Sequence, residues 1–259
     1  MAEPVPVALV TGAASGMGRA AAERYAAGGW RVALVDRERA GLVAVESAIA
    51  TAGGTAGAFA ADVTRPSEID AAVDAALARF GRVDVVVAAA GVWSEGPVEL
   101  LDEAEYDRVM DVNVRGVVFT ARAAIAPLRA SGGGAILTIA SDAGLQANRG
   151  AALYCASKGA VVLFSKTLAL DLAPDGIRVN AVCPGDVMTP MLAGQAAVHG
   201  GDDPDGYLRR LLAGYPQGDR ARFLDPAEVA ELLWYLGQPL ARGITGAAIS
   251  IDQGLSSGI

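Results

Sequence analysis

Short apolar runs alternate with helix-forming stretches along most of this 259-residue chain. Near the N-terminus, an apolar run over residues 5–10 leads through a glycine-containing turn into an alanine-rich stretch over 16–27, and a second apolar run covers 31–35. Strand, turn, helix and strand within about 30 residues are typical of a parallel βαβ unit. The apolar runs lack alternating polar residues, which indicates strands covered by helices on both faces of a sheet. The pattern predicts a doubly wound α/β fold.

The same alternation continues along most of the chain, and the number of apolar runs gives the number of expected strands. About seven parallel strands in a single domain spanning residues 1–259 are predicted, because a chain of this length fits one large α/β domain. Further helices are predicted over 39–52, 66–80, 103–129, 152–172 and 226–236, and further strands over 56–60, 83–87, 135–139, 178–182 and 247–251.

The alternation breaks at residues 190–222, where Gly, Asp, Pro, Gln and Arg dominate. A short helix over 207–212 is the one element predicted there. Long polar interruptions inside compact domains are usually lids or substrate loops. We expect this insertion to close over a substrate, and a solvated insertion without a role is the alternative.

Composition excludes several classes of function. The net charge of −8, without blocks of like charge, argues against a surface that binds nucleic acid. Two cysteines form at most one bridge, and a single histidine beside them does not make a structural zinc site. No window reaches about 18 uncharged apolar residues, and the N-terminus lacks the features of a signal peptide. A cytoplasmic protein without a metal is expected.

The first strand-to-helix turn carries the pattern of a dinucleotide site. Its glycines are spaced as Gly-x-x-x-Gly-x-Gly, which allows a tight turn and a close approach of the backbone to a pyrophosphate. Asp36 ends the second strand about 20 residues later, where a carboxylate accepts hydrogen bonds from ribose hydroxyls and repels a 2′-phosphate. NAD is therefore predicted over NADP. Arg37 is the residue that could favour a phosphate instead.

Tyr154 and Lys158 form the pair that points most directly to chemistry. Four residues apart on a predicted helix, they lie on one face and within reach of each other. A nearby ammonium favours the phenolate, so it lowers the pKa of a tyrosine toward the range in which it works as a base. The chain has only two lysines, Lys158 and Lys166, which makes a chance pairing with tyrosine rare.

Together with these residues, further motifs make the chain resemble the short-chain dehydrogenase/reductase family over essentially its whole length. They are the glycine turn, Asp62-Val63, Asn113, Ser141 thirteen residues before Tyr154, and Pro184-Gly185-x-Val187-x-Thr189. The resemblance implies a Rossmann fold and a catalytic set of Asn113, Ser141, Tyr154 and Lys158. It implies that Tyr154 is the acid/base, Ser141 binds the substrate oxygen, Lys158 binds the nicotinamide ribose and lowers the pKa of Tyr154, and Asn113 holds a water of the proton relay.

The resemblance also implies where cofactor and substrate bind. The expected cofactor residues are Gly12, Ser15, Gly16, Met17, Gly18, Asp36, Asp62, Val63, Ala89, Ala90, Gly91, Tyr154, Lys158, Pro184, Gly185, Val187 and Thr189. The expected substrate residues are Trp93, Ser141, Leu145, Gln146, Asn148 and Tyr154. In one departure from the family, Ala88 and Ala89 stand where an asparagine pair is usual, and this puts the local stability of the sheet in doubt.

The expected reaction is NAD-dependent interconversion of a secondary alcohol and a ketone. An NADPH-dependent reductase of carrier-bound 3-oxoacyl chains and a catalytically idle NAD-binding regulator are the alternatives. The resemblance also implies a homo-oligomer, a tetramer, with the helices predicted over 103–129 and 152–172 at its interface. A small-molecule alcohol or ketone is the expected partner, and neither nucleic acid nor a membrane is.

Overall fold

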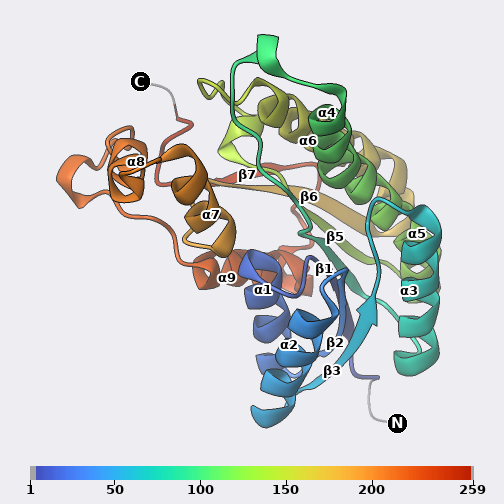
Figure 1. The fold of residues 1–259 in the computed structure, drawn as a ribbon. Coiled ribbons are helices and arrows are strands. Elements are labelled where there is room, and N and C mark those ends of the chain that lie inside the picture. The colour runs from blue at the N-terminus through green and yellow to red at the C-terminus, as the bar shows by residue number, and fades with distance from the viewer. Residues whose placement is uncertain (1–3, 258–259) are drawn as a thin grey trace.

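The computed structural model describes residues 4–257 of the chain. Its strands form one parallel sheet in the order β3-β2-β1-β4-β5-β6-β7 (Figure 1). The strand order changes direction between β1 and β4, which is the switch point of a doubly wound fold. The predicted fold class is therefore confirmed. The strands are β1 (Val7–Thr11), β2 (Arg31–Asp36), β3 (Thr55–Ala60), β4 (Val85–Ala88), β5 (Gly134–Ile139), β6 (Ile177–Pro184) and β7 (Ala248–Ile251).

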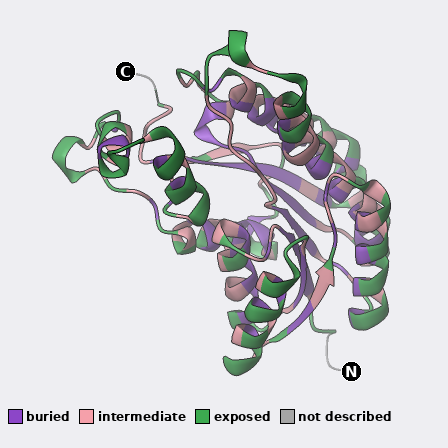
Figure 2. Cartoon of the chain, viewed as in Figure 1, coloured by how far each residue is buried: buried purple, intermediate pink, exposed green. Residues whose placement is uncertain are grey.

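Helices cover both faces of this sheet (Figure 1). Side chains alternate along a strand, so Val32 and Leu34 of β2 enter one apolar core, while Ala33 and Val35 enter the other. Figure 2 shows the buried strands between helices whose outer faces are exposed. One layer consists of α1 (Gly16–Ala27), α2 (Arg39–Thr51) and α9 (Pro226–Gly237), and the other of α3 (Pro66–Phe80), α5 (Gly116–Ala130) and α6 (Ala152–Leu172), with α4 (Glu103–Met110) packed on α6.

Local sequence signals explain where several helices begin and end. Pro66 opens α3 at the first position, where its missing N–H costs nothing, and Gly81 ends the helix in the left-handed region with φ of +83°. Asp225 and Glu228 form a reciprocal capping box at the start of α9. The bounds predicted over 16–27, 66–80 and 152–172 are confirmed without change.

The helix predicted over 103–129 is interrupted. A π-helical turn at Asp111–Arg115 separates α4 from α5. Asn113 lies in this turn, fully buried, and its side chain bonds both the N–H and the carbonyl of Val92, 21 residues earlier in the chain. Single π turns are frequent at functional sites. Hydrophobic periodicity does not reveal such a turn, because it adds a residue without ending the helix.

The insertion at 190–222 contains α7 (Pro190–His199) and α8 (Pro204–Leu212), which lie apart from the two helical layers (Figure 1). The helix predicted over 207–212 is present but begins three residues earlier, at Pro204, and α7 was not predicted. Thr189 caps α7 by accepting a hydrogen bond from the N–H of Leu192, and Pro190 follows it at the first helical position.

Among the described residues, the span Ala152–Asp175 is long and apolar enough to cross a membrane. It contains α6, which packs against β6 and lies over the sheet. This is the place of a core helix in an α/β domain.

Candidate active site

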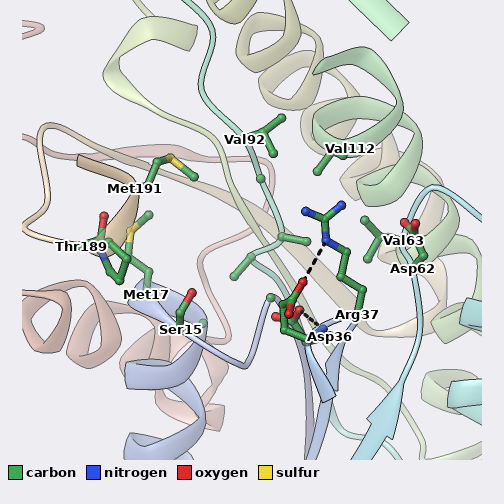
Figure 3. Close-up of a pocket in the computed structure, with 18 of the residues that line it drawn as sticks. Ser15, Met17, Asp36, Arg37, Asp62, Val63, Val92, Val112, Thr189 and Met191 are labelled. Atoms are coloured by element: carbon green, nitrogen blue, oxygen red, sulfur yellow. Dashed lines mark hydrogen bonds and ion pairs between the residues drawn. The ribbon is translucent and has the colours of Figure 1, made fainter. Parts of the chain in front are cut away.

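A cavity of about 250 Å³ opens at the switch point of the sheet, beyond the carboxyl ends of β1, β2 and β4 (Figure 3). Open α/β sheets bind ligands at this place. Twelve residues expected to bind the cofactor lie along its walls. They are Gly12, Ser15, Gly16, Met17, Gly18, Asp36, Asp62, Val63, Ala89, Ala90, Gly91 and Thr189.

The glycine turn brings backbone to the floor of this cavity. Gly12 has φ of +68°, and a Cβ there would lie 2.8 Å from the backbone nitrogen of Ala90. A Cβ on Gly18 would collide with the carbonyl of Gly12. Ser15 makes no side-chain capping bond within residues 4–257, so the first N–H groups of α1 stay open toward the cavity. This turn fits a pyrophosphate, which takes its hydrogen bonds from backbone N–H groups at a helix N-terminus.

Asp36 is held in place at the end of β2. Its Oδ2 accepts from the N–H of Ala14 at 3.1 Å, and its Oδ1 accepts from the N–H of Glu38 at 3.0 Å. Each carboxylate oxygen keeps a lone pair for a ligand hydroxyl. Figure 3 shows the exposed side chain of Arg37 extending beside it along the cavity wall.

Across the cavity, the carboxylate of Asp62 accepts from the N–H of Thr64 at 2.9 Å. Burial acts to raise the pKa of this carboxyl, but the hydrogen bonds from Thr64 and the charges of Arg37 and Arg65 outweigh it, so the pKa is lowered. Asp62 therefore stays an acceptor for a ligand amine at neutral pH.

Gly91 lies between the cavity and two buried polar side chains, those of Asn113 and Lys158. A Cβ at this position would lie 3.5 Å from both Asn113 Oδ1 and Lys158 Nζ. Asn113 holds the backbone here: its Oδ1 accepts from Val92 N at 2.8 Å, and its Nδ2 donates to Val92 O and to Ser157 Oγ. Both amide hydrogens of Asn113 are thus engaged within the protein.

Tyr154 and Lys158 lie one turn apart on α6, as the spacing predicts, and both are buried. The ammonium is 5.7 Å from the centre of the Tyr154 ring and donates to the carbonyl of Ile139 at 2.9 Å. Burial lowers the pKa of Lys158 to about 8. Because this value is above neutral, most of the lysine remains charged at pH 7.

The pKa of Tyr154 is raised within the protein. Burial of the phenol is the main cause, and the charges of Asp142 and Asp186 act in the same direction. A hydrogen bond with Ser141 acts to lower this pKa, but burial and these two carboxylates outweigh it. Sequence spacing did not reveal them, because Asp142 and Asp186 come from other parts of the chain.

Ser141 lies at the end of β5 and begins a short 3₁₀ turn. Its hydroxyl donates to Asp142 Oδ1 at 2.8 Å and accepts from the N–H of Ala143. The other oxygen of Asp142 accepts from the side-chain amides of Gln146 and Asn148, at 3.2 and 3.3 Å. Gln146 and Asn148, expected to contact substrate, thus hold the buried carboxylate that binds Ser141.

Trp93 covers Tyr154, with ring centres 4.3 Å apart. The indole donates to Glu95 Oε2 at 3.2 Å, and the hydroxyl of Tyr207 in α8 donates to the same oxygen at 2.9 Å. A chain of contacts therefore runs from the insertion, through Glu95 and Trp93, to the phenol.

Comparisons with known proteins agree with this geometry. A sequence family described as enoyl-(acyl carrier protein) reductase matches residues 12–256. D-threitol dehydrogenase of Mycolicibacterium smegmatis is 39% identical over 249 residues, which cover 96% of this chain and 92% of that enzyme. The chain belongs to the short-chain dehydrogenase/reductase family. It is therefore an oxidoreductase of the type that acts on secondary alcohols and ketones.

Two solved short-chain dehydrogenase/reductase structures are also similar over nearly the whole chain. One is a 3-ketoacyl-(acyl-carrier-protein) reductase from Brucella melitensis with NADH: it has a TM-score of 0.86 and 38% identity, and covers 98% of this chain and 99% of its own. The other is a variant of actinorhodin polyketide ketoreductase with NADPH, with a TM-score of 0.92, 37% identity and 97% coverage of both chains.

Other residues expected at the site of this short-chain dehydrogenase/reductase lie outside the cavity wall. Pro184, Gly185 and Val187 are among them; a Cβ on Gly185 would lie 2.8 Å from the Tyr215 hydroxyl, and Val187 is paired with Leu224. Leu145 is partly exposed, at 40% of its surface. The wall also contains residues not predicted to bind, although each lies within two positions of one that was: Glu38, Ala61, Val92, Val112, Pro190 and Met191.

The alanine pair that departs from the family pattern does not interrupt the sheet. Ala88 pairs with Thr11 of β1 and with Thr138 of β5, and Ala89 lines the cavity. The loop after β4 is held by Asn113 through Val92.

Proposed function

We propose that this protein is an NAD-dependent dehydrogenase that interconverts a secondary alcohol and a ketone, with Tyr154 as the acid/base. The observation that carries the proposal is the buried Tyr154–Lys158 pair on α6, which meets the cavity wall at Gly91. A phenol with a lysine beside it, next to a site that fits a dinucleotide, matches the needs of proton and hydride transfer.

In the oxidative direction, Tyr154 as phenolate accepts the hydroxyl proton of the alcohol while the carbinol hydrogen leaves as hydride. The nicotinamide, when bound, supplies the hydride acceptor. Lys158 carries the positive charge that favours the phenolate and donates to the ribose. Ser141 binds the substrate oxygen, and Asn113 positions the loop at Val92 and holds a water of the proton relay. In the reverse direction, Tyr154 returns the proton to the carbonyl oxygen.

The choice of NAD rests on Asp36. Its carboxylate is fixed by two backbone N–H groups and keeps free lone pairs for the two ribose hydroxyls. The same charge opposes a 2′-phosphate. Arg37, exposed at the cavity wall, is the observation that favours the second candidate, an NADPH-dependent 3-oxoacyl reductase.

The insertion at 190–222 is proposed to close over the substrate. Tyr207 binds Glu95, and Glu95 binds Trp93, whose ring lies on Tyr154. A substrate at the Tyr154 hydroxyl would therefore lie beneath α7 and α8. We also propose that the protein is cytoplasmic and tetrameric, with α4, α5 and α6 at the interface; Leu163 and Leu170 are exposed on α6.

The test is a panel of secondary alcohols with NAD and NADP, and of the matching ketones with NADH and NADPH, followed by cofactor absorbance. Polyols, cyclic alcohols, hydroxy acids and a 3-oxoacyl thioester belong in the panel. Turnover of an alcohol with NAD at higher kcat/KM than with NADP is expected. Preferred turnover of the thioester with NADPH would support the second candidate, and cofactor binding without any turnover would indicate an idle regulator.

A further inference from the structure

The Ser141 hydroxyl has one hydrogen and more than one possible acceptor. Ser141 lies within hydrogen-bonding reach of Tyr154, and a hydrogen bond between them acts to lower the pKa of Tyr154, although burial outweighs it. In the structure, however, Ser141 Oγ lies 2.8 Å from Asp142 Oδ1, and a carboxylate can only accept. The hydrogen given to Asp142 is not available to Tyr154 or to a substrate carbonyl at the same time.

The hydrogen and the two lone pairs of the Ser141 hydroxyl limit the hydrogen bonds that it can still form. Its hydrogen goes to Asp142, and one lone pair takes the N–H of Ala143. The remaining lone pair can only accept, either from the Tyr154 hydroxyl or from the hydroxyl of an alcohol. To donate to a ketone or a phenolate, Ser141 must leave Asp142, and a buried carboxylate oxygen then loses a charge-assisted hydrogen bond.

The surroundings of Asp142 stabilise its hydrogen bond with Ser141. It is buried, with 6% of its surface exposed, and its Oδ2 accepts from the Gln146 and Asn148 amides. Those two donors fix the carboxylate so that Oδ1 faces Ser141. The same loop also wraps around the backbone of Asp142, whose carbonyl accepts from the N–H groups of Leu145 and Gln146.

From these contacts we infer that Asp142 is a positioning residue: it takes the hydrogen of Ser141 away from Tyr154 and so adds to the effect of burial in keeping the phenol neutral in the resting enzyme. The inference rests on the proposed role of Tyr154 as acid/base. It assigns to Asp142 the control of when the phenolate forms, and it makes the release of Ser141 from Asp142 part of alcohol oxidation.

Several other groups act on Tyr154, and the test has to separate them from Asp142. Lys158 and Cys155 lie on the same helix as Tyr154. Asp186 approaches from the end of β6, and Glu95 is connected through Trp93. Asp186 is the useful control, because its charge also raises the pKa of Tyr154 but its carboxylate binds Tyr215 rather than Ser141.

Asp142→Asn reverses the hydrogen bond. The amides of Gln146 and Asn148 require an acceptor, so the new side chain presents its carbonyl to them and its NH₂ to Ser141. Ser141 then accepts from that NH₂, and its own hydrogen is free for Tyr154. Asp142→Ala removes the acceptor without adding a donor and serves as the second variant.

The measurement is the titration of Tyr154 by carbon NMR in the full-length protein labelled at tyrosine Cζ. The chain has six tyrosines, and Tyr154→Phe identifies the signal. We expect the phenolate of Tyr154 to appear at least about one pH unit lower in Asp142→Asn and Asp142→Ala than in the wild type, a tenfold change in the ionisation constant. Asp186→Asn, which removes a charge without releasing Ser141, is expected to give a smaller shift.

The same variants in a Ser141→Ala background separate the effect of the Ser141–Asp142 hydrogen bond from the effect of the charge of Asp142. Without the serine hydroxyl, Asp142→Asn is expected to shift the titration clearly less than it does in the wild-type background, because only the charge effect of Asp142 remains. An equal shift in both backgrounds, or no shift in either, would overturn the inference. The readout needs no substrate, so a protein that shows this coupling but turns over no alcohol would refute the proposed function while the control of Tyr154 by Asp142 through Ser141 would stand.

Discussion

Replacing Asp36 by alanine is expected to move the cofactor preference from NAD toward NADP. The carboxylate has a free lone pair on each oxygen for the two ribose hydroxyls, because each oxygen is already held by one backbone N–H. Hydrogen bonds to a charged group contribute about 1.5 kcal/mol each, so the loss of two costs about 3 kcal/mol. This corresponds to a decrease in kcat/KM with NAD of about 150-fold.

The same change removes the negative charge that opposes a 2′-phosphate, and Arg37 remains exposed at the cavity wall. We therefore expect kcat/KM with NADP to rise in Asp36→Ala. Steady-state kinetics with an alcohol from the panel and each cofactor measures both values. Thermal unfolding checks that the N–H groups of Ala14 and Glu38, which lose their acceptor, do not destabilise the fold by more than about 1 kcal/mol each.

Glu38→Ala is the matched control, because Glu38 also lines the cavity and is a carboxylate, but its exposed side chain pairs with Arg37. Its preference between cofactors is expected to change by about threefold or less, in line with the small contribution of exposed ion pairs. If Asp36→Ala kept its kcat/KM with NAD within a few-fold of the wild type, the assignment of Asp36 to the ribose would be refuted.

Three further outcomes are expected. Lys158→Arg should lower kcat/KM by about 100-fold or more, because a guanidinium lacks the compact head that this buried position holds. Lys166→Arg, on the exposed side of the same helix, should leave kcat/KM unchanged, and equal activity of the two variants would contradict the expectation. Tyr207→Phe, which loses the bond to Glu95, should raise KM for the alcohol while thermal stability changes little, and an unchanged KM would argue against closure. The pKa of Asp186 is raised to about 6 by burial and by the charge of Asp142, so its ionisation costs folding stability as pH rises from about 4 to 6, by about 3 kcal/mol at most. Asp186→Asn should therefore raise the Tm at pH 7.5 and not at pH 4, and the opposite pH dependence would contradict the sign.

Much of the fold could be predicted because local and global signals agree. The apolar runs, the glycine turn and the helical stretches over 16–27, 66–80 and 152–172 each carry their own signals, and the structure places them as predicted. The π turn at Asp111–Arg115 could not be found in this way, because it is fixed by bonds between Asn113 and Val92. By contrast, α7 carried a readable signal, since Thr189 and Pro190 are a common helix start.

The site, too, could be predicted only in part. The residues of the cavity wall that are expected to bind the dinucleotide lie next to one another in short motifs, so most of them could be predicted. The environment of Tyr154 could not, because it depends on tertiary contacts: Asp186 acts on the phenol from the end of β6, and the Tyr207–Glu95 bond spans 112 residues. The orientation of the Asp142 carboxylate toward Ser141 likewise depends on the loop that carries Gln146 and Asn148.

The most direct test of the account compares the wild type with Tyr154→Phe, which removes one oxygen from a buried ring and keeps the contact with Trp93. Turnover of the best alcohol with NAD and binding of NADH by fluorescence are measured on both proteins. Loss of proton transfer is expected to lower kcat by about 100-fold or more, while the dissociation constant for NADH stays within about threefold. A Tyr154→Phe variant that kept most of its turnover would contradict the central claim.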